Sequence, residues 1–164
     1  MADSKLSLKN IHHVYEQKKQ AGTEAIRHID LEVRDGELLA IVGASGCGKS
    51  TLLRQLKPAI APHGERLGQI LLDGQPLESL SQADSSRRIG FVQQNVDNQL
   101  VTDKVWHELA FGLESLGFDT PTIRRRVAEM ASFFGIQDWF YKNVTELSGG
   151  QKQLLSLASV MVMQ

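Results

Sequence analysis

The sequence predicts an α/β fold with an antiparallel sheet near its N-terminus and a helical insert in its second half. Three observations predict it. A glycine-rich loop at residues 43–51 stands between an apolar run and a helical segment. Alternating apolar and polar residues precede this loop, and apolar residues at helical spacing follow it. The chain has 164 residues, enough for one domain with a genuine core.

The glycine-rich loop fits the phosphate-binding pattern of Gly, four residues, Gly, Lys and then Ser or Thr. The apolar residues 38–42 before it predict a buried parallel strand. Residues 50–56 after it predict a helix that ends before Pro58. Strand, loop and helix in this order are the context that the pattern requires, so we expect the core of a P-loop NTPase.

The residue types in the loop suit a polyphosphate. Glycines let the backbone turn tightly and approach a phosphate, while the loop N–H groups and the helix start face it. We expect Lys49 to contact the β- and γ-phosphates, Ser50 to bind Mg²⁺ and Thr51 to hydrogen-bond the α-phosphate. The alternative is a glycine-rich turn that binds nothing. The predicted nucleotide-binding residues of the loop are Gly43, Ala44, Ser45, Gly46, Cys47, Gly48, Lys49, Ser50 and Thr51.

Composition excludes several classes. Lys and Arg number 18 against 19 Asp and Glu, and this balance gives no support for a nucleic-acid-binding surface. No apolar run approaches the length of a membrane span, and residues 1–5 do not resemble a signal peptide. Cys47, the single cysteine, excludes an internal disulfide. We interpret it as a small side chain in the loop, because no histidine that could activate a thiol lies near it in the sequence.

Before the loop, residues 6–8 and 29–33 alternate apolar and polar side chains and predict strands. Polar residues 16–23 predict a loop between them, and Asp35-Gly36 predicts a turn. His12 and His13 are adjacent, so on a strand they would point to opposite faces, and we infer no metal site from them.

After the loop helix, residues 58–68 predict an irregular connector. Residues 69–74 form an apolar run that ends in Asp73-Gly74. Such an aspartate could hold Mg²⁺ at the end of a core strand, but a turn after an antiparallel strand is the simpler interpretation. Residues 89–92 predict a second core strand that leads into Gln94.

The second half is mostly helical. Residues 104–112 predict one helix, and residues 120–134 predict another, with Thr120 as its cap and Gly135 as its end. The three arginines at 124–126 could form a nucleic-acid patch, but the neutral total charge favours a solvated face. Ser148 and two glycines predict the cap of a further helix over residues 151–163, which is a second helix start that attracts anions.

These residues together identify a resemblance. Leu147-Ser148-Gly149-Gly150-Gln151, about 100 residues after the phosphate loop, resembles the signature motif of ABC transporter ATPases. The resemblance covers the whole chain. It implies that Tyr15 stacks on adenine and that Gln94 is the Q-loop glutamine, which helps bind Mg²⁺ and the attacking water. Lys49 and Gln94 would then be the catalytic residues. It further implies that Ser148, Gly149, Gly150 and Gln151 contact ATP held by a second ATPase domain. For Gln94 the alternative is an exposed polar residue after a strand.

A narrower resemblance is carried by residues 94–102 and 108–114, which are similar to ATPases of energy-coupling-factor importers of vitamins and metal ions. Residues 56–66 resemble the subgroup in which two ATPase domains are fused. Val96 and Gln93 depart from the pattern, since many relatives have Pro and Phe or Met there. The resemblance implies transmembrane subunits as partners, a location at the cytoplasmic face of the membrane, and no nucleic acid.

We predict three parts within one truncated domain: a core with its antiparallel sheet at residues 1–94, a Q-loop and helical subdomain at 95–150, and the signature helix at 151–164. The family next needs an Asp-Glu pair and a switch histidine, which these residues lack. We therefore expect an ATPase in the complete protein and inactivity of the 164 residues alone. The alternatives are a nucleotide-binding fragment without turnover and an ABC ATPase that acts off the membrane. An unrelated phosphate-loop kinase or GTPase would leave residues 147–151 without a role.

Overall fold

The computed structural model describes residues 4–16 and 23–164, so most of the predicted loop at 16–23 lies outside the described residues. The chain divides into two compact units, residues 1–85 and 86–164, and each is treated by itself. The first unit contains β1 (Ser4–Tyr15), β2 (Thr23–Arg34), α1 (Lys49–Gln55), η1 (Pro58–Ile60), β3 (Glu65–Leu72), β4 (Gln75–Pro76) and η2 (Leu77–Ser79), and α2 (Gln82–Arg88) spans the boundary. The second contains η3 (Val96–Asn98), α3 (Val105–Ser115), α4 (Thr120–Phe133), η4 (Gln137–Trp139), η5 (Val144–Glu146) and α5 (Gly149–Met161).

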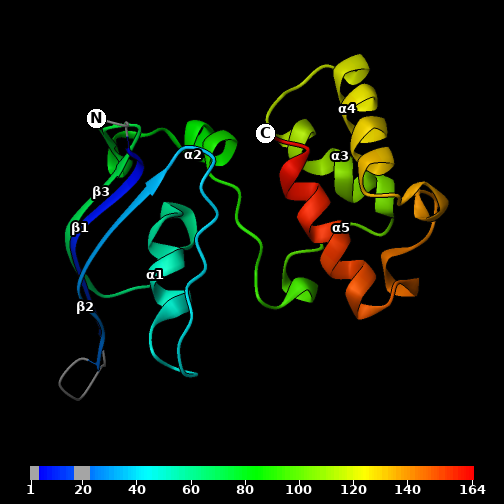
Figure 1. Cartoon of the computed structure of the whole chain (residues 1–164). Coiled ribbons are helices and arrows are strands. Elements are labelled where there is room, and N and C mark those ends of the chain that lie inside the picture. Colours follow the sequence, from blue (N-terminus) through cyan, green and yellow to red (C-terminus); the bar gives the residue numbers. More distant parts are fainter. Residues whose placement is uncertain (1–3, 17–22) are drawn as a thin grey trace. The chain divides into compact units, whose positions relative to one another are not determined.

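The first unit is built on an antiparallel sheet with the strand order β2-β1-β3-β4 (Figure 1). Leu8 on the central strand β1 lies opposite Leu31 of β2 and Ile70 of β3. Leu8, Ile11 and Ile70 are almost completely buried. The predicted antiparallel sheet is therefore confirmed, because alternation along β1 and β2 directs one set of side chains into a common core.

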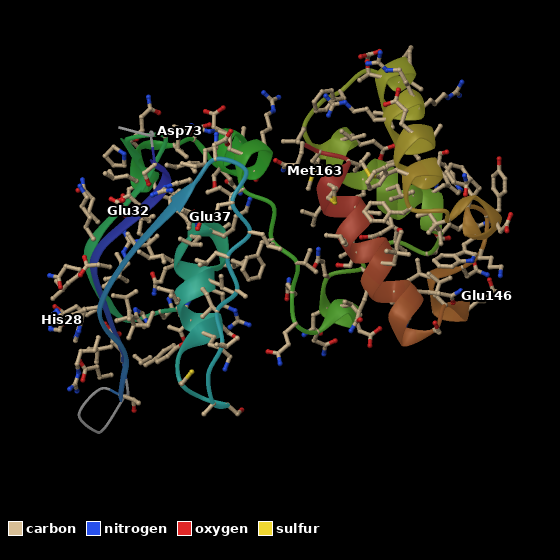
Figure 2. The ribbon with its side chains drawn as sticks, in the orientation of Figure 1. His28, Glu32, Glu37, Asp73, Glu146 and Met163 are labelled. Carbon is tan, nitrogen blue, oxygen red and sulfur yellow. The ribbon has the colours of Figure 1, made fainter. Side chains whose placement is uncertain are left out.

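The turn between β3 and β4 confirms the simpler interpretation of Asp73. Asp73 and Gly74 have φ values of 49° and 75°, and Leu72 pairs with Gln75. Two consecutive positive φ angles are typical of the hairpin turn that follows the right-handed twist of two strands. The Asp73 carboxylate forms an ion pair with Lys5 of β1 at 3.0 Å, and Figure 2 shows it at the sheet's end.

Two predicted core strands are absent. Residues 38–42 and 89–92 form no strand, and Leu38 and Val42 are 98% and 87% exposed. A strand must hydrogen-bond to a neighbour, and no described strand pairs with either segment. The apolar composition predicted burial, but no residue of either segment is buried. The predicted connector at residues 58–68 also ends earlier than expected, because β3 starts at Glu65.

The second unit is a helical cluster in which α5 packs on α3 and α4 (Figure 1). A Cβ on Gly112 of α3 would lie 2.4 Å from the Met163 sulfur, so glycine lets the two segments approach closely. Figure 2 labels Met163 at the end of α5. Helical spacing places the shared side chains on facing sides. The buried residues of this core include Val105, Leu109, Leu113, Val127, Ala131, Ile136, Val144, Leu147, Leu155 and Ala158.

The predicted helices are present with shifted bounds: α3 continues to Ser115 rather than ending at 112, and α5 spans Gly149–Met161 rather than 151–163. One predicted cap is also wrong. α4 begins at Thr120, but its cap is Asp119, whose side chain accepts a hydrogen bond from the Thr122 backbone. Both residues are good caps, and only the backbone path decides between them. Gly135, with φ 64°, ends this helix as predicted.

The arginine cluster of α4 is only partly solvated. Arg124 and Arg125 are exposed, whereas Arg126 donates hydrogen bonds to the carbonyl oxygens of Val162 and Gln164. Its guanidinium also lies 4.9 Å from the centroid of the Phe118 ring. Arg126 therefore joins α4 to the end of α5 and is not part of a free basic face.

Candidate functional site

The glycine-rich loop lies in the first unit, residues 1–85, which we call the sheet unit. It forms an exposed turn, and α1 begins at Lys49. Gly48 is the N-cap of this helix and has φ 96°, in the left-handed region that glycine favours. A Cβ on Gly48 would lie 2.4 Å from the Ala25 carbonyl oxygen of β2. Glycine at position 48 is therefore required both by the backbone angle and by the close approach of the loop to the sheet.

The Lys49 side chain folds back over the loop. Its ammonium donates hydrogen bonds to the carbonyl oxygens of Gly43 at 2.9 Å and Ala44 at 2.7 Å, and it lies 3.7 Å from the Cys47 sulfur. Residues 43–47 are all exposed, including the free thiol of Cys47. The positive charge of Lys49 thus lies at an open glycine-rich turn, where its only partners among the described residues are carbonyl dipoles and a sulfur.

Two predicted ligand-binding residues contact each other. The Tyr15 hydroxyl, at the end of β1, lies 2.9 Å from the Thr51 hydroxyl in the first turns of α1. Thr51 is 8% exposed, whereas Ser50 beside it is exposed. The structure therefore links the residue predicted to bind adenine directly to the helix predicted to bind phosphate. This bond joins residues 36 positions apart, which no sequence pattern could reveal.

His13 is a residue that sequence reasoning left without a role. Its ring is fully buried and meets the Tyr15 ring edge to face, with 4.8 Å between centroids. Neither ring nitrogen has a hydrogen-bond partner among the described residues. Burial, and then the positive charges of Arg66 and His12, lower the pKa of His13, so the neutral ring is favoured in the folded chain.

Gln94 is exposed in a bend that precedes η3. Neighbouring side chains shape this segment, since the Gln93 backbone donates to the Gln99 side chain at 2.7 Å and the Asn95 side chain accepts from the Asp97 backbone. Hydrogen bonds between side chains and backbone thus shape the chain around Gln94, where we expected a core strand to lead into this residue. Gln94 and the phosphate loop belong to different units, so their joint action stays a prediction.

The segment after Gln94 is joined to α5 and α3 by charged side chains that the sequence did not single out. Lys152 of α5 forms an ion pair with Asp97 at 2.7 Å, across 55 residues of sequence. The buried Glu108 carboxylate of α3 accepts hydrogen bonds from the Val101 and Thr102 backbone N–H groups and from the Thr102 hydroxyl. These contacts hold the segment against α3 and α5 within the second unit, residues 86–164, which we call the helical unit.

The signature segment is a well-defined helix start. Ser148 caps α5, with its hydroxyl accepting from the Gln151 N–H at 3.3 Å and the Gln151 side chain accepting from the Ser148 N–H at 2.8 Å. A second capping box, made by Asn143 and Glu146, fixes the turn immediately before it, and Figure 2 shows Glu146 beside the start of α5. This reciprocal arrangement satisfies N–H groups that a helix start otherwise leaves open.

Steric contacts among the described residues do not explain why glycine stands at the two positions after Ser148. Gly149 and Gly150 are exposed, and a Cβ on either would have no atom of the described chain within 4 Å. Neither has a positive φ. Glycine is less favourable than alanine in a helix by up to about 1 kcal/mol. No contact among the described residues therefore requires glycine at these two positions.

Among the described residues, no group of three or more His, Cys, Asp or Glu side chains could hold a metal ion. No helix within residues 4–16 and 23–164 is both long and apolar enough to cross a bilayer.

Known proteins are similar to this chain in sequence and in fold. A putative ABC transporter ATP-binding protein of Bacillus anthracis is 46% identical over 157 residues, which are 96% of this chain and 28% of that protein. An energy-coupling factor transporter ATP-binding protein, EcfA1, of Symbiobacterium thermophilum is 36% identical over 169 residues, covering 100% of this chain and 58% of that protein. The solved structure of cbiO1 from Clostridium perfringens, part of the ABC transporter complex cbiONQ, has a TM-score of 0.79 and 32% identity.

The solved structure matches 98% of this chain over 62% of its own length, so the chain spans only part of its relatives. The family described as ABC transporter matches residues 26–164, a range that includes the glycine-rich loop, the Gln94 segment and the capped helix start at Ser148. The resemblance seen in the sequence is thereby confirmed, and the chain belongs to the ABC transporter family of ATPase domains.

Proposed function

We propose that this chain is the ATP-binding part of an ATPase that energises an energy-coupling-factor importer of a vitamin or a metal ion. The observation that carries the proposal is the Lys49 ammonium lying over an exposed glycine-rich turn, 2.7–2.9 Å from backbone carbonyl oxygens. The names of the relatives support the transporter class. Transport itself is proposed for the complete protein.

The loop is suited to a triphosphate. A phosphate oxygen carries a full negative charge, so it would be a stronger partner for Lys49 than the carbonyl dipoles of Gly43 and Ala44. The loop N–H groups would bind the remaining oxygens. Ser50 and Gln94 are the residues that would hold Mg²⁺, whose chemistry is to neutralise charge on the terminal phosphates. Lys49 would then stabilise the charge that develops on the γ-phosphate, and Gln94 would orient water.

The start of α5 would act on ATP bound by a second ATPase domain. Ser148, Gly149 and Gly150 are exposed, and the open space around both glycines accommodates a ligand that approaches the backbone. The positive end of the α5 dipole favours an anion there. Two domains that face each other head to tail would each receive a γ-phosphate in this way.

The proposed cycle is a population shift. ATP bound between two domains adds contacts to both and favours the closed pair, and its hydrolysis removes the bridging charge. The segment around η3 and α3 would pass this motion to a transmembrane subunit at the cytoplasmic face of the membrane. The ion pair between Lys152 and Asp97 joins that segment to α5, which supports a shared movement.

Alkylation of Cys47 tests nucleotide binding directly. This thiol is exposed within the loop, 3.7 Å from the Lys49 ammonium, so bound MgATP would cover it. We expect MgATP to slow the reaction of Cys47 with N-ethylmaleimide at least about 10-fold in the full-length protein, read by mass spectrometry of the loop peptide. In Lys49→Ala the protection should disappear. Equal rates with and without MgATP in the wild type would refute the proposal.

Two substitutions at Ser148 test the contact across domains. Asp and Asn both cap helices well, so Ser148→Asp and Ser148→Asn should preserve the start of α5. Aspartate would place a negative charge against the γ-phosphate, so ATP-dependent pairing of the domains should be lost in Ser148→Asp and retained in Ser148→Asn. Analytical ultracentrifugation with and without ATP distinguishes them. Normal pairing of the aspartate variant would exclude the contact.

A further inference from the structure

We infer that Tyr15 also acts as a positioning residue for the phosphates, by orienting the Thr51 hydroxyl through the hydrogen bond between them. This inference rests on the proposed function, in which Thr51 binds the α-phosphate. It adds a second role to Tyr15, one that does not depend on the base of the nucleotide.

The direction of the hydrogen bond follows from counting protons. Tyr15 and Thr51 have one hydroxyl proton each, and only one of these can lie in the 2.9 Å bond between the two oxygens. An anionic phosphate oxygen only accepts hydrogen bonds, so Thr51 must direct its own proton to the phosphate. Tyr15 must then donate to the Thr51 oxygen. A phenol, being more acidic than an alcohol, is the better donor of the two, and donors in such a chain strengthen one another.

Neighbouring groups restrict the side chains of both Thr51 and Tyr15. Thr51 is a buried residue of α1, 8% exposed, so its neighbours restrict the side chain. The Tyr15 ring packs edge to face with the ring of His13, which is fully buried on β1. The Tyr15 hydroxyl is therefore directed from the end of β1 onto α1. Without it, the Thr51 hydroxyl would lose the partner that fixes its rotation.

Tyr15→Phe is the variant that isolates the hydroxyl, because it keeps the ring for stacking. Two probes separate the roles of ring and hydroxyl: MgATP, and magnesium tripolyphosphate, which has no base. We expect Tyr15→Phe in the full-length protein to weaken both about 3- to 10-fold by calorimetry, the range that one hydrogen bond supports. Tyr141→Phe is the matched control, since the other tyrosine of the chain is 78% exposed, and it should bind both probes as the wild type does.

A double-mutant cycle tests whether the effect passes through Thr51. Thr51→Val removes that hydroxyl with little change of shape, and adding Tyr15→Phe to it should cause no further loss for tripolyphosphate. Full additivity of the two losses would overturn the inference and indicate general destabilisation. A loss for MgATP alone would also overturn it, leaving Tyr15 as a base-stacking residue. If the wild type binds both probes and Tyr15→Phe binds them equally well, the inference fails while the proposed function stands. Absence of wild-type binding would refute both.

Discussion

The two glycine-rich helix starts of this molecule are stabilised in different ways. The start of α5 has a reciprocal cap between Ser148 and Gln151, and behind it lie fully buried side chains such as Leu155. The phosphate loop follows an exposed segment, in which Leu38 is 98% exposed, and its Lys49 side chain bonds to the loop's own carbonyl oxygens. The start of α5 thus combines a local cap with a buried core behind it, whereas the glycine-rich loop is exposed and the Lys49 contacts within it are local.

This difference has a physical cause. A helix satisfies its hydrogen bonds within one segment, so α5 needs only an apolar neighbour such as α3. A strand depends on another strand for its hydrogen bonds, and residues 38–42 have none among the described strands. The signature segment should therefore tolerate changes elsewhere in the chain, whereas the phosphate loop should respond to whatever contacts it. The following substitutions test that comparison, from the largest expected effect to the smallest.

The largest effect should come from the core behind the signature segment. Leu155→Ala should lower the free energy of unfolding of the helical unit by about 2–5 kcal/mol, because it leaves a cavity. Val42→Ala, at a site that is 87% exposed, should change it by less than about 0.5 kcal/mol in these 164 residues. Tryptophan fluorescence in urea follows the helical unit, since both tryptophans, Trp106 and Trp139, lie in it, and circular dichroism in the same titration also follows the unit of residues 1–85, which contains Val42. Equal losses at both sites would contradict the comparison.

Loss of the α5 cap should be smaller. Ser148→Ala removes the acceptor of the Gln151 N–H and should destabilise the helical unit by about 1 kcal/mol. Ser148→Asn, which keeps an acceptor, should stay near the wild-type value in the same urea experiment. A cap that contributes nothing would show both variants at the wild-type stability.

Gly150→Ala should have effects of opposite sign on stability and on function. A Cβ at this position meets no described atom, so alanine should stabilise α5 by up to about 1 kcal/mol. The same methyl group would obstruct a phosphate that approaches the helix start, so ATP-dependent pairing of the full-length protein should weaken. Unchanged pairing, measured by ultracentrifugation beside the urea curve, would show that position 150 does not require glycine for function.

A pH effect distinguishes the sheet unit from the helical unit. The pKa of His13 is lowered in the folded chain, so the unfolded chain binds its proton first as the pH falls. The stability that depends on neutral His13 is complete above the unfolded-state pKa, about 6.5, and is lost as the pH falls through the lower folded-state value. His13→Phe should flatten this dependence in thermal unfolding followed by circular dichroism between pH 7.5 and 5. A slope identical to that of the wild type would assign the effect to other groups.

The smallest effect should come from the ion pair of Lys152 with Asp97. Both side chains reach solvent, and Asp97 is 68% exposed, so Lys152→Met should cost at most about 1 kcal/mol. Added salt should reduce the difference between the two proteins. A loss of several kcal/mol would mean that η3 depends on this pair far more than its exposure implies.

Several elements could be predicted because their signals are local. The turn at Asp73-Gly74, the end of α4 at Gly135 and the cap of α5 by Ser148 each follow from the conformational preference of one or two residues. Whether residues 38–42 and 89–92 form strands could not be predicted from these residues alone, since a strand needs a neighbouring strand for its hydrogen bonds. The assignment of the α4 cap to Thr120 failed because Asp119 is an equally good cap one residue earlier.

By itself, the sequence determined the chemistry at two positions along the chain: a glycine-rich loop that ends in Lys49, and a helix start at Ser148. Tertiary structure alone decided that the Tyr15 hydroxyl meets Thr51, that His13 is buried with no hydrogen-bond partner among the described residues, and that Lys152 pairs with Asp97. The physical reason is how far apart along the sequence the interacting residues lie. Caps and turns depend on residues a few positions apart, whereas these contacts join side chains that come together only when strands and helices pack.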